Sequence, residues 1–196
     1  MKPKVFFSLS ITSLLLLGSA SVGFAQSTPP PVSFSAPLLY QTGLYPSGIA
    51  VADFNGDGIL DLAVVNNGND TVSILLGNGD GTFKPGVAYA TEHYPFGIAV
   101  GDFNGDGYLD LAIACQSVDK VSILLGNGDG TFKAETPYPT GHGPVGIATG
   151  SFRGNGTLDL VVADYWDNSV SVLLGNGNGT FQSPAILPTG NGTNPE

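Results

Sequence analysis

Residues 53–61 read Asp-Phe-Asn-Gly-Asp-Gly-Ile-Leu-Asp, and residues 102–110 read Asp-Phe-Asn-Gly-Asp-Gly-Tyr-Leu-Asp. Each stretch places three carboxylates and one amide around two glycines, in a chain of which only 11% of residues are charged. A third copy at residues 151–159, Ser-Phe-Arg-Gly-Asn-Gly-Thr-Leu-Asp, keeps the glycines and a single carboxylate. The stretch therefore marks a repeated unit that concentrates negative charge in two of its three copies.

The repeat has a period of 49 residues, seen at Phe54, Phe103 and Phe152. A period in this range is typical of solenoids and propellers. Short apolar runs between Asn- and Gly-rich turns predict four strands per copy, and no segment shows helical periodicity. In the first copy the predicted strands are residues 48–54, 60–65, 71–77 and 83–91. Four short antiparallel strands make one propeller blade, so the sequence predicts an all-β chain with three complete blades.

Residues 34–42 align with residues 83–91, which predicts one extra N-terminal strand ahead of the first blade. Residues 34–196 are accordingly predicted to form the repeat domain of a partial or fragmentary propeller. Three blades leave open flanks with apolar faces, which isolated proteins avoid. Two explanations remain open: the chain is a fragment of a longer propeller, or it associates with a second copy to close a ring.

The residues of the first stretch have the chemistry of a calcium loop. Calcium takes six to eight oxygen ligands from carboxylates, amides, backbone carbonyls and water. The side chains of Asp53, Asn55 and Asp57 alternate along the loop, and the carbonyl of Ile59 and the side chain of Asp61 complete the set. The two glycines permit the backbone angles that so short a loop requires. We therefore expect Ca²⁺ here rather than an ion-free turn rich in Asp and Asn, which is the alternative.

The spacing overlaps the first nine positions of an EF-hand loop but departs from it afterwards. The twelfth position, a bidentate Glu in EF-hands, is Val64 in one copy and Ile113 in the other, and strands rather than helices are predicted on both sides. The EF-hand interpretation is therefore rejected.

Together with the sequence Leu-Leu-Gly-Asn-Gly-Asp-Gly-Thr-Phe at residues 75–83 and 124–132, these loops resemble the FG-GAP/VCBS-type repeats. Such repeats build the β-propeller of integrin α chains and of many bacterial exported proteins. The resemblance covers residues 34 to about 189 and implies a ring with more blades than this chain has, with calcium in the turn between the first two strands of a blade. Carried over by position, the implied ligands are Asp53, Asn55, Asp57, Ile59 and Asp61 in one loop, and Asp102, Asn104, Asp106, Tyr108 and Asp110 in the other.

The third loop lacks most of these ligands. Ser151, Arg153 and Asn155 replace Asp, Asn and Asp, and Asp159 is the one carboxylate left. We expect Arg153 to supply an internal cation to Asp159, so that this loop binds no ion.

The N-terminus has the features of an export signal. Lys2 and Lys4 precede an apolar run at residues 5–17, and Gly23-Phe24-Ala25 provides small residues for cleavage after Ala25. Residues 1–25 are therefore predicted to be a signal peptide and residues 26–33 a linker, which predicts a secreted, periplasmic or cell-surface protein without membrane insertion after signal removal. The net charge of −10 at pH 7 argues against nucleic acid as a partner.

No residue pattern points to catalysis. His93 and His142 are themselves one repeat apart in the turns between blades, without a neighbouring nucleophile, and the single cysteine, Cys115, ends an apolar run typical of a buried strand. Tyr165 and Trp166 stand between two aspartates and are candidates for stacking on a sugar ring or anchoring a protein. Covering a blade edge is their alternative role.

The sequence thus predicts an exported, calcium-binding, non-enzymatic propeller that serves adhesion or binds an unknown protein or glycan partner. A carbohydrate-binding, lectin-like module and an accessory propeller domain of an exported hydrolase remain as alternatives.

Overall fold

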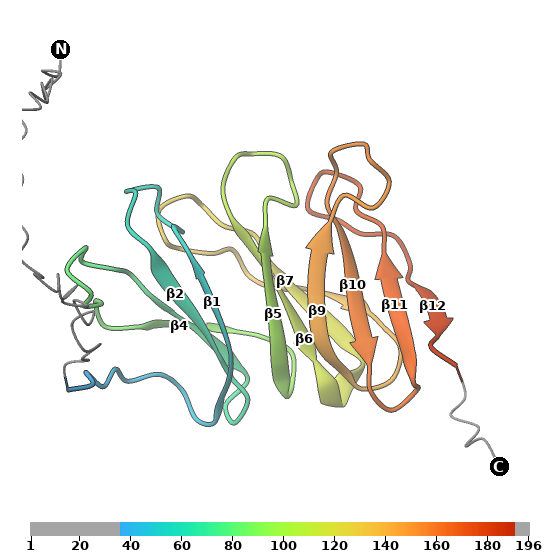
Figure 1. Cartoon of the computed structure of the whole chain (residues 1–196), viewed down its shortest axis with the longest axis horizontal. Coiled ribbons are helices and arrows are strands. Elements are labelled where there is room, and N and C mark those ends of the chain that lie inside the picture. The colour runs from blue at the N-terminus through green and yellow to red at the C-terminus, as the bar shows by residue number, and fades with distance from the viewer. Residues whose placement is uncertain (1–35, 191–196) are drawn as a thin grey trace, which may run out of the picture. The chain divides into compact units, whose positions relative to one another are not determined.

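The computed structural model describes residues 36–190. The predicted signal peptide (residues 1–25) and linker (residues 26–33) lie outside these residues. Every strand belongs to the compact unit Pro37–Glu196. Figure 1 shows the strands as three groups that follow one another along the chain.

The three groups are antiparallel sheets of four strands each, which we call blades 1, 2 and 3. Blade 1 consists of β1 (Pro46–Ala52), β2 (Asp61–Asn66), β3 (Thr71–Leu75) and β4 (Val87–Ala90). Blade 2 consists of β5 (Pro95–Gly101), β6 (Asp110–Cys115), β7 (Lys120–Leu124) and β8 (Thr136–Pro139), with the single-turn helix η1 (Gln116–Val118) between β6 and β7. Blade 3 consists of β9 (Pro144–Gly150), β10 (Asp159–Asp164), β11 (Ser169–Leu173) and β12 (Ala185–Pro188). The prediction of an all-β chain with three blades is confirmed.

Strands pair in the order of the chain within each blade, and the fourth strand lies at the outer edge. β8 carries Pro137 and Pro139, which an edge strand tolerates because its outward backbone groups need no partner. The fourth strands are shorter than predicted. In blade 1, for example, Phe83 forms only an isolated bridge with Gly77 before the chain rejoins the sheet at Val87.

The hydrophobic core lies between neighbouring blades. Alternate residues of each strand point to opposite faces of a sheet, so a central strand packs on both sides. β6 shows this clearly because all six of its residues are buried. Leu111, Ile113 and Cys115 pack against blade 1, while Ala112 and Ala114 pack against blade 3.

The predicted extra strand at residues 34–42 is not formed in the part that the structure describes. Residues 36–42 have no regular structure, although Tyr40 packs edge-on against Phe83 with 5.5 Å between ring centroids. The physical reason is the lack of a partner, because a fourth strand pairs with the third strand of its own blade, and the described residues contain no such strand ahead of β1.

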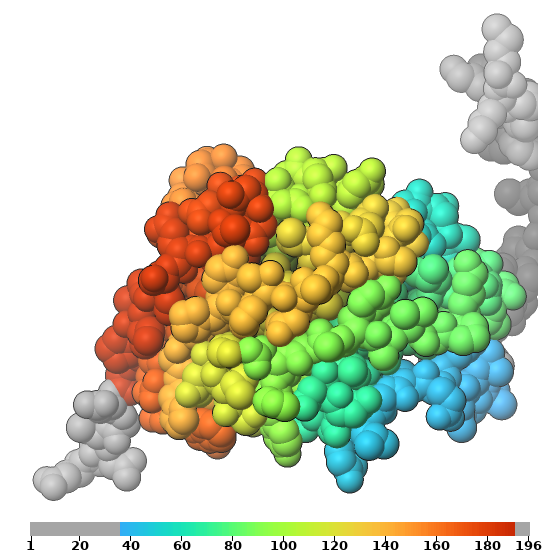
Figure 2. Space-filling model, turned by 180° about the vertical axis from the view of Figure 1, so that it is seen from behind, coloured from blue at the N-terminus to red at the C-terminus, as the bar shows by residue number. Residues whose placement is uncertain are grey.

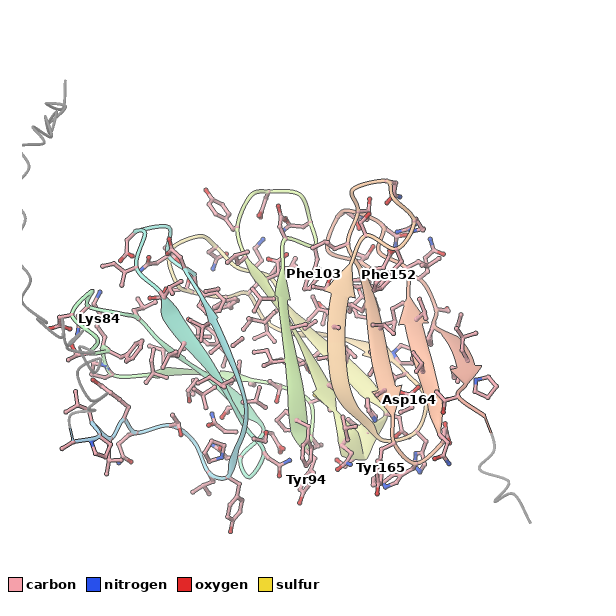
Figure 3. The ribbon with its side chains drawn as sticks, in the orientation of Figure 1. Lys84, Tyr94, Phe103, Phe152, Asp164 and Tyr165 are labelled. Carbon is pink, nitrogen blue, oxygen red and sulfur yellow. The ribbon has the colours of Figure 1, made fainter. Side chains whose placement is uncertain are left out.

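The loops lie at two opposite ends of the strands. The carboxylate loops join the first and second strands, and labelled Phe103 and Phe152 mark this end in Figure 3. The turns between second and third strands and the connections between blades lie at the other end, marked by Tyr94 and Tyr165. We call this other end the loop face. Within residues 36–190 no helix is long and apolar enough to span a membrane.

Candidate metal loops and an aromatic loop face

The first carboxylate loop is closed by hydrogen bonds from its own backbone. The carboxylate of Asp53 accepts from the N–H groups of Gly56 and Gly58, each at 2.8 Å. The amide oxygen of Asn55 accepts from Asp57 N–H at 2.9 Å. Gly56 (φ 72°) and Gly58 (φ 83°) adopt the left-handed conformation, as the sequence predicts.

The second loop repeats this arrangement. Asp102 accepts from Gly105 N–H at 2.7 Å and from Gly107 N–H at 2.9 Å. Asn104 accepts from Asp106 N–H at 2.8 Å. The two loops therefore present the same oxygen atoms at the same end of neighbouring blades.

The last carboxylate of each loop has a structural role that sequence reasoning missed. Asp61 is fully buried and accepts from Phe54 N–H at 2.9 Å and from Gly77 N–H at 2.8 Å. Asp110 makes the same pair of bonds, to Phe103 and Gly126. Each aspartate thus ties the carboxylate loop to the turn that follows the third strand.

The charge on Asp110 is poorly compensated in this position. Burial raises the pKa of Asp110 to about 6 in spite of its hydrogen bonds from Gly126 and Phe103, and the charges of Asp106 and Asp102 add to the rise.

In blade 3, Arg153 contacts the equivalent carboxylate, as predicted. Its Nη2 lies 2.5 Å from Oδ1 of Asp159 and 2.6 Å from the carbonyl oxygen of Gly175, and its Nε lies 3.2 Å from Oδ2 of Asp159. Burial acts to raise the pKa of Asp159, but the hydrogen bonds from Arg153 and Gly175 and the charge of Arg153 hold it below its usual value. A cation is therefore accommodated at this carboxylate while its backbone bond to Gly175 N–H remains.

The donor set of the first two loops fits calcium in type. Asp53, Asn55 and Asp57 offer hard oxygen atoms at least partly open to solvent. Each carboxylate oxygen of Asp57 accepts one hydrogen bond, as does Oδ2 of Asp53, whereas Oδ1 of Asp53 accepts two. Across residues 36–190, no three His, Cys, Asp or Glu side chains lie close enough together to hold a metal ion. An ion in these loops would therefore depend on amide and carbonyl oxygens and on reorientation of the carboxylates.

The loop face presents exposed aromatic rings from all three blades. Tyr45 and Tyr94 are one repeat apart, have left-handed backbones (φ 51° and 61°), and are 76% and 49% exposed. The equivalent residue in blade 3 is Gly143, and there Trp166, 48% exposed, lies over the glycine. A Cβ at Gly143 would come within 2.7 Å of the indole ring. Blade 3 therefore supplies its ring from the opposite loop.

In blade 1 the large and the small residue occupy the opposite positions from those in blade 3. Tyr45 covers Gly68, where an added Cβ would lie 2.3 Å from the tyrosine ring, and Gly68 aligns with Trp166 in the repeat. Sequence reasoning found Trp166 and missed Tyr45 and Tyr94. Their spacing of 49 residues is the feature of the sequence that indicates equivalent positions in two blades.

Backbone bonds hold Trp166 and its surroundings in place. Trp166 N–H donates to the carbonyl of His142 at 3.1 Å, and the two rings lie 4.8 Å apart between centroids. His142 N–H donates to Asp167 at 2.7 Å. Tyr165 is 67% exposed and its N–H donates to Gly143. The predicted pair Tyr165 and Trp166 thus lies on a hydrogen-bonded loop, with Tyr165 exposed and Trp166 packed over Gly143.

The two histidines each pair with an aspartate from the preceding blade. His93 Nδ1 lies 2.6 Å from Asp70, and His142 Nδ1 lies 2.9 Å from Asp119. The hydrogen bond and charge of Asp119 raise the pKa of His142. Cys115 is fully buried, and burial raises the pKa of its thiol to about 12, so it remains a thiol at neutral pH.

Three four-stranded blades with a carboxylate loop between the first two strands define a β-propeller repeat protein. The FG-GAP-like repeat model matches residues 53–113 and again residues 102–162, which together span more than half of the 196 residues. The chain belongs to the FG-GAP-like repeat family.

Solved structures are similar over about 70% of this chain. A lectin of Agrocybe aegerita that recognises non-reducing terminal N-acetylglucosamine is 27% identical over 69% of this chain and 36% of its own, with a TM-score of 0.48. The Photorhabdus luminescens Tc holotoxin pore is 20% identical over 74% of this chain and 7% of its own, with a TM-score of 0.45. A Lactobacillus plantarum protein is 12% identical over 71% of this chain and 36% of its own, with a TM-score of 0.39. The chain thus spans a small part of each of these structures. A search of curated proteins finds no match.

Proposed function

We propose that this chain is an exported, non-enzymatic binding protein that holds Ca²⁺ in the loops at residues 53–61 and 102–110 and contacts its partner with the loop face. The location would be secreted, periplasmic or on the cell surface. Membership of the FG-GAP-like repeat family supports a binding role.

The observation that carries the proposal is the repeated aromatic ring of the loop face. Tyr45, Tyr94 and Trp166 leave large apolar areas in water, which costs free energy in the isolated protein. The tyrosines also adopt a backbone conformation that is unfavourable for a bulky residue. In blade 3, where Gly143 replaces the tyrosine, Trp166 from another loop supplies an aromatic ring instead. The three rings are therefore well explained as contacts for a partner.

Calcium would act on stability in this proposal. Among the described residues, the carboxylates of Asp53 and Asp57 form no ion pair with a basic side chain. A cation between them would remove the repulsion between their charges. It would fix the end of blades 1 and 2 opposite the loop face, and the partner would bind without contacting the metal.

A glycan is the second candidate partner. Trp166 lies beside His142 and Asp167, so an apolar ring and polar groups occur together, as sugar recognition requires. Adhesion through a protein partner needs the same rings but no particular polar neighbour.

The proposal is tested by measuring binding of the labelled full chain to a glycan array and to intact cells of the species that produces it. Replacing Tyr45, Tyr94 and Trp166 together by Ser should lower binding to the true partner by about tenfold or more, since aromatic anchors dominate interface energies. Glycan binding that depends on Trp166→Ser would select the second candidate.

Tyr108→Ser is the matched control. Tyr108 is 49% exposed, as Tyr94 is, but lies in a carboxylate loop at the opposite end of the strands. Equal loss of binding in the control and the triple variant, or binding unchanged by the triple variant, would contradict the assignment of the loop face.

A further inference from the structure

Each boundary between blades contains a cluster of three aromatic rings. Between blades 1 and 2, Phe132 lies 5.8 Å from Phe54 and 5.5 Å from Tyr89. Between blades 2 and 3, Phe181 lies 5.6 Å from Phe103 and 5.4 Å from Tyr138. The members of the two clusters are one repeat apart. They edge-pack in the way that aromatic rings prefer.

A third cluster is present in two halves at opposite flanks of the row of blades. Phe83 and Tyr40 form one half at the flank of blade 1, with ring centroids 5.5 Å apart. Phe152 is the other half, at the flank of blade 3, and is labelled in Figure 3. Phe54 and Phe103 are 3% and 2% exposed, whereas Phe152 is 55% exposed. Phe152 is therefore the same residue as Phe54 and Phe103, which are buried between blades, but it has no neighbouring blade among the described residues to bury it.

The donor and the acceptor of one backbone hydrogen bond are separated in the same way, at the two flanks. Phe54 carbonyl accepts from Gly130 N–H at 3.1 Å, and Phe103 carbonyl accepts from Gly179 N–H at 2.9 Å. The next pair in this series would join the carbonyl of Phe152 to Gly81, at the two flanks. A Cβ placed on Gly81 would meet no atom within 4 Å.

Gly146 gives a third, independent indication. Its equivalents Gly48 and Gly97 approach the next blade closely, because an added Cβ would lie 2.4 Å from the carbonyl oxygen of Phe96 and 2.3 Å from that of Val145, respectively. At Gly146 the nearest atom to such a Cβ is in Ala163 of the same blade, at 3.7 Å. A glycine inside a strand weakens it and usually marks the approach of another backbone.

We infer that the flank of blade 3 binds blade 1 of a second copy of this chain, head to tail. In this contact, equivalent residues of the repeat would pack as they do at the two boundaries between blades inside the molecule. Phe152 of one copy completes the cluster of Phe83 and Tyr40 in the next, and Gly146 receives the carbonyl of the second copy's Ser47. Such a contact repeats into a ring if the rotation closes and into a filament if it does not.

The fourth strand at the new boundary comes from the second copy. Tyr40 occupies the position of Tyr89 and Tyr138 in this series, while β12 has Leu187 there. Residues 37–42 of the second copy and β12 of the first would therefore occupy the same place. β12 is exposed at all four residues. We therefore expect residues 37–42 of the second copy to displace β12 and to pair with β11. This pairing would make residues 37–42 the strand that the sequence predicts.

Sedimentation equilibrium of the full chain, expressed with its own leader, tests the contact. The expected mass is two or a higher multiple of the chain. Gly146→Val should raise the dissociation constant by about tenfold or more, because its side chain fits the open space of one copy but blocks the second backbone. Phe152→Asp should do the same by removing the ring.

Tyr165→Asp is the control, because it changes an exposed aromatic of blade 3 at the loop face and should leave the mass unchanged. Circular dichroism checks that each variant is folded. A single-chain mass at every concentration would overturn the inference, and so would association that survives both Gly146→Val and Phe152→Asp.

A cysteine pair tests the strand exchange. By the repeat, Leu38 of one copy would face Val172 of the other, as Val87 faces Ile74. The double variant Leu38→Cys and Val172→Cys should therefore give a covalent dimer under oxidation, whereas each single variant should not. Association without this covalent dimer would overturn the exchange of β12.

Discussion

Arg153 occupies the position at which blades 1 and 2 carry Asn55 and Asn104. Its guanidinium contacts both oxygens of the buried Asp159, so one side chain supplies the charge that a metal ion is proposed to supply in the other loops. Blade 3 therefore has an internal cation at the place where we propose an external one for blades 1 and 2.

Arg153→Ala should lower the free energy of unfolding by roughly 2 kcal/mol at pH 7, because it leaves a buried carboxylate without its partner. Since Arg153 lowers the pKa of Asp159, its contribution is present above about pH 4 and is lost as the pH falls through the folded-state pKa. Urea unfolding at pH 7 and pH 3 measures both effects. Arg153→Lys, which keeps the charge, should recover part of the loss, and equal stability of all three proteins would refute the internal cation.

Asp164 is a buried carboxylate of a different kind. It accepts hydrogen bonds from Ser169 and Ser171, and its Oδ1 has no partner among the described residues. Burial raises its pKa, and the charge of Asp167 adds to the rise. Ionised Asp164 therefore destabilises the fold as the pH rises from about 4 through the raised pKa.

Asp164→Asn should increase the free energy of unfolding at pH 7 by about 1 kcal/mol, since blade 1 has Asn66 at this position with all its hydrogen bonds made. The gain should vanish near pH 3, where Asp164 is protonated in both states. Thermal unfolding at the two pH values is the measurement. A lower melting temperature of the variant at pH 7 would show that the ionised carboxylate is required.

At the scale of the elements, the repeat made most of the fold predictable. Its 49-residue period located three sheets of four strands, because strand and turn residues recur at fixed offsets. The strand at residues 34–42 was not predictable in the same way, since a strand depends on a partner that its own residues do not reveal. Similarly, the ring of Trp166 replaces that of a tyrosine in another loop, which only the folded chain brings together.

The carboxylate loops make a prediction at this scale. Ser151→Asp, Arg153→Asn and Asn155→Asp together give the third loop the residues of the first at these positions. The triple variant should bind one more Ca²⁺ per chain than the unmodified protein, as measured by isothermal titration calorimetry. An unchanged stoichiometry would mean that these side chains do not define a calcium site.

In the whole molecule, we assign separate roles to the two ends of the strands. We propose that the carboxylate loops stabilise the blades and that the loop face, marked by Tyr94 in Figure 3, contacts a partner through Tyr45, Tyr94 and Trp166, which are all exposed. In the view from behind, residues from 37 onward (blue) lie beside blade 1, and β12 (red) lies at the far end of the row (Figure 2). These are the two flanks that the head-to-tail contact would join.

We propose that the first two loops bind calcium, and a calorimetric titration of the full chain with Ca²⁺ measures this binding. The unmodified chain should bind two ions, and the double variant Asp53→Asn with Asp57→Asn should bind one. The melting temperature should also rise with calcium concentration, because a ligand that binds the folded state stabilises it. If the unmodified chain binds no calcium, or if the double variant still binds two ions, these loops are not the calcium sites.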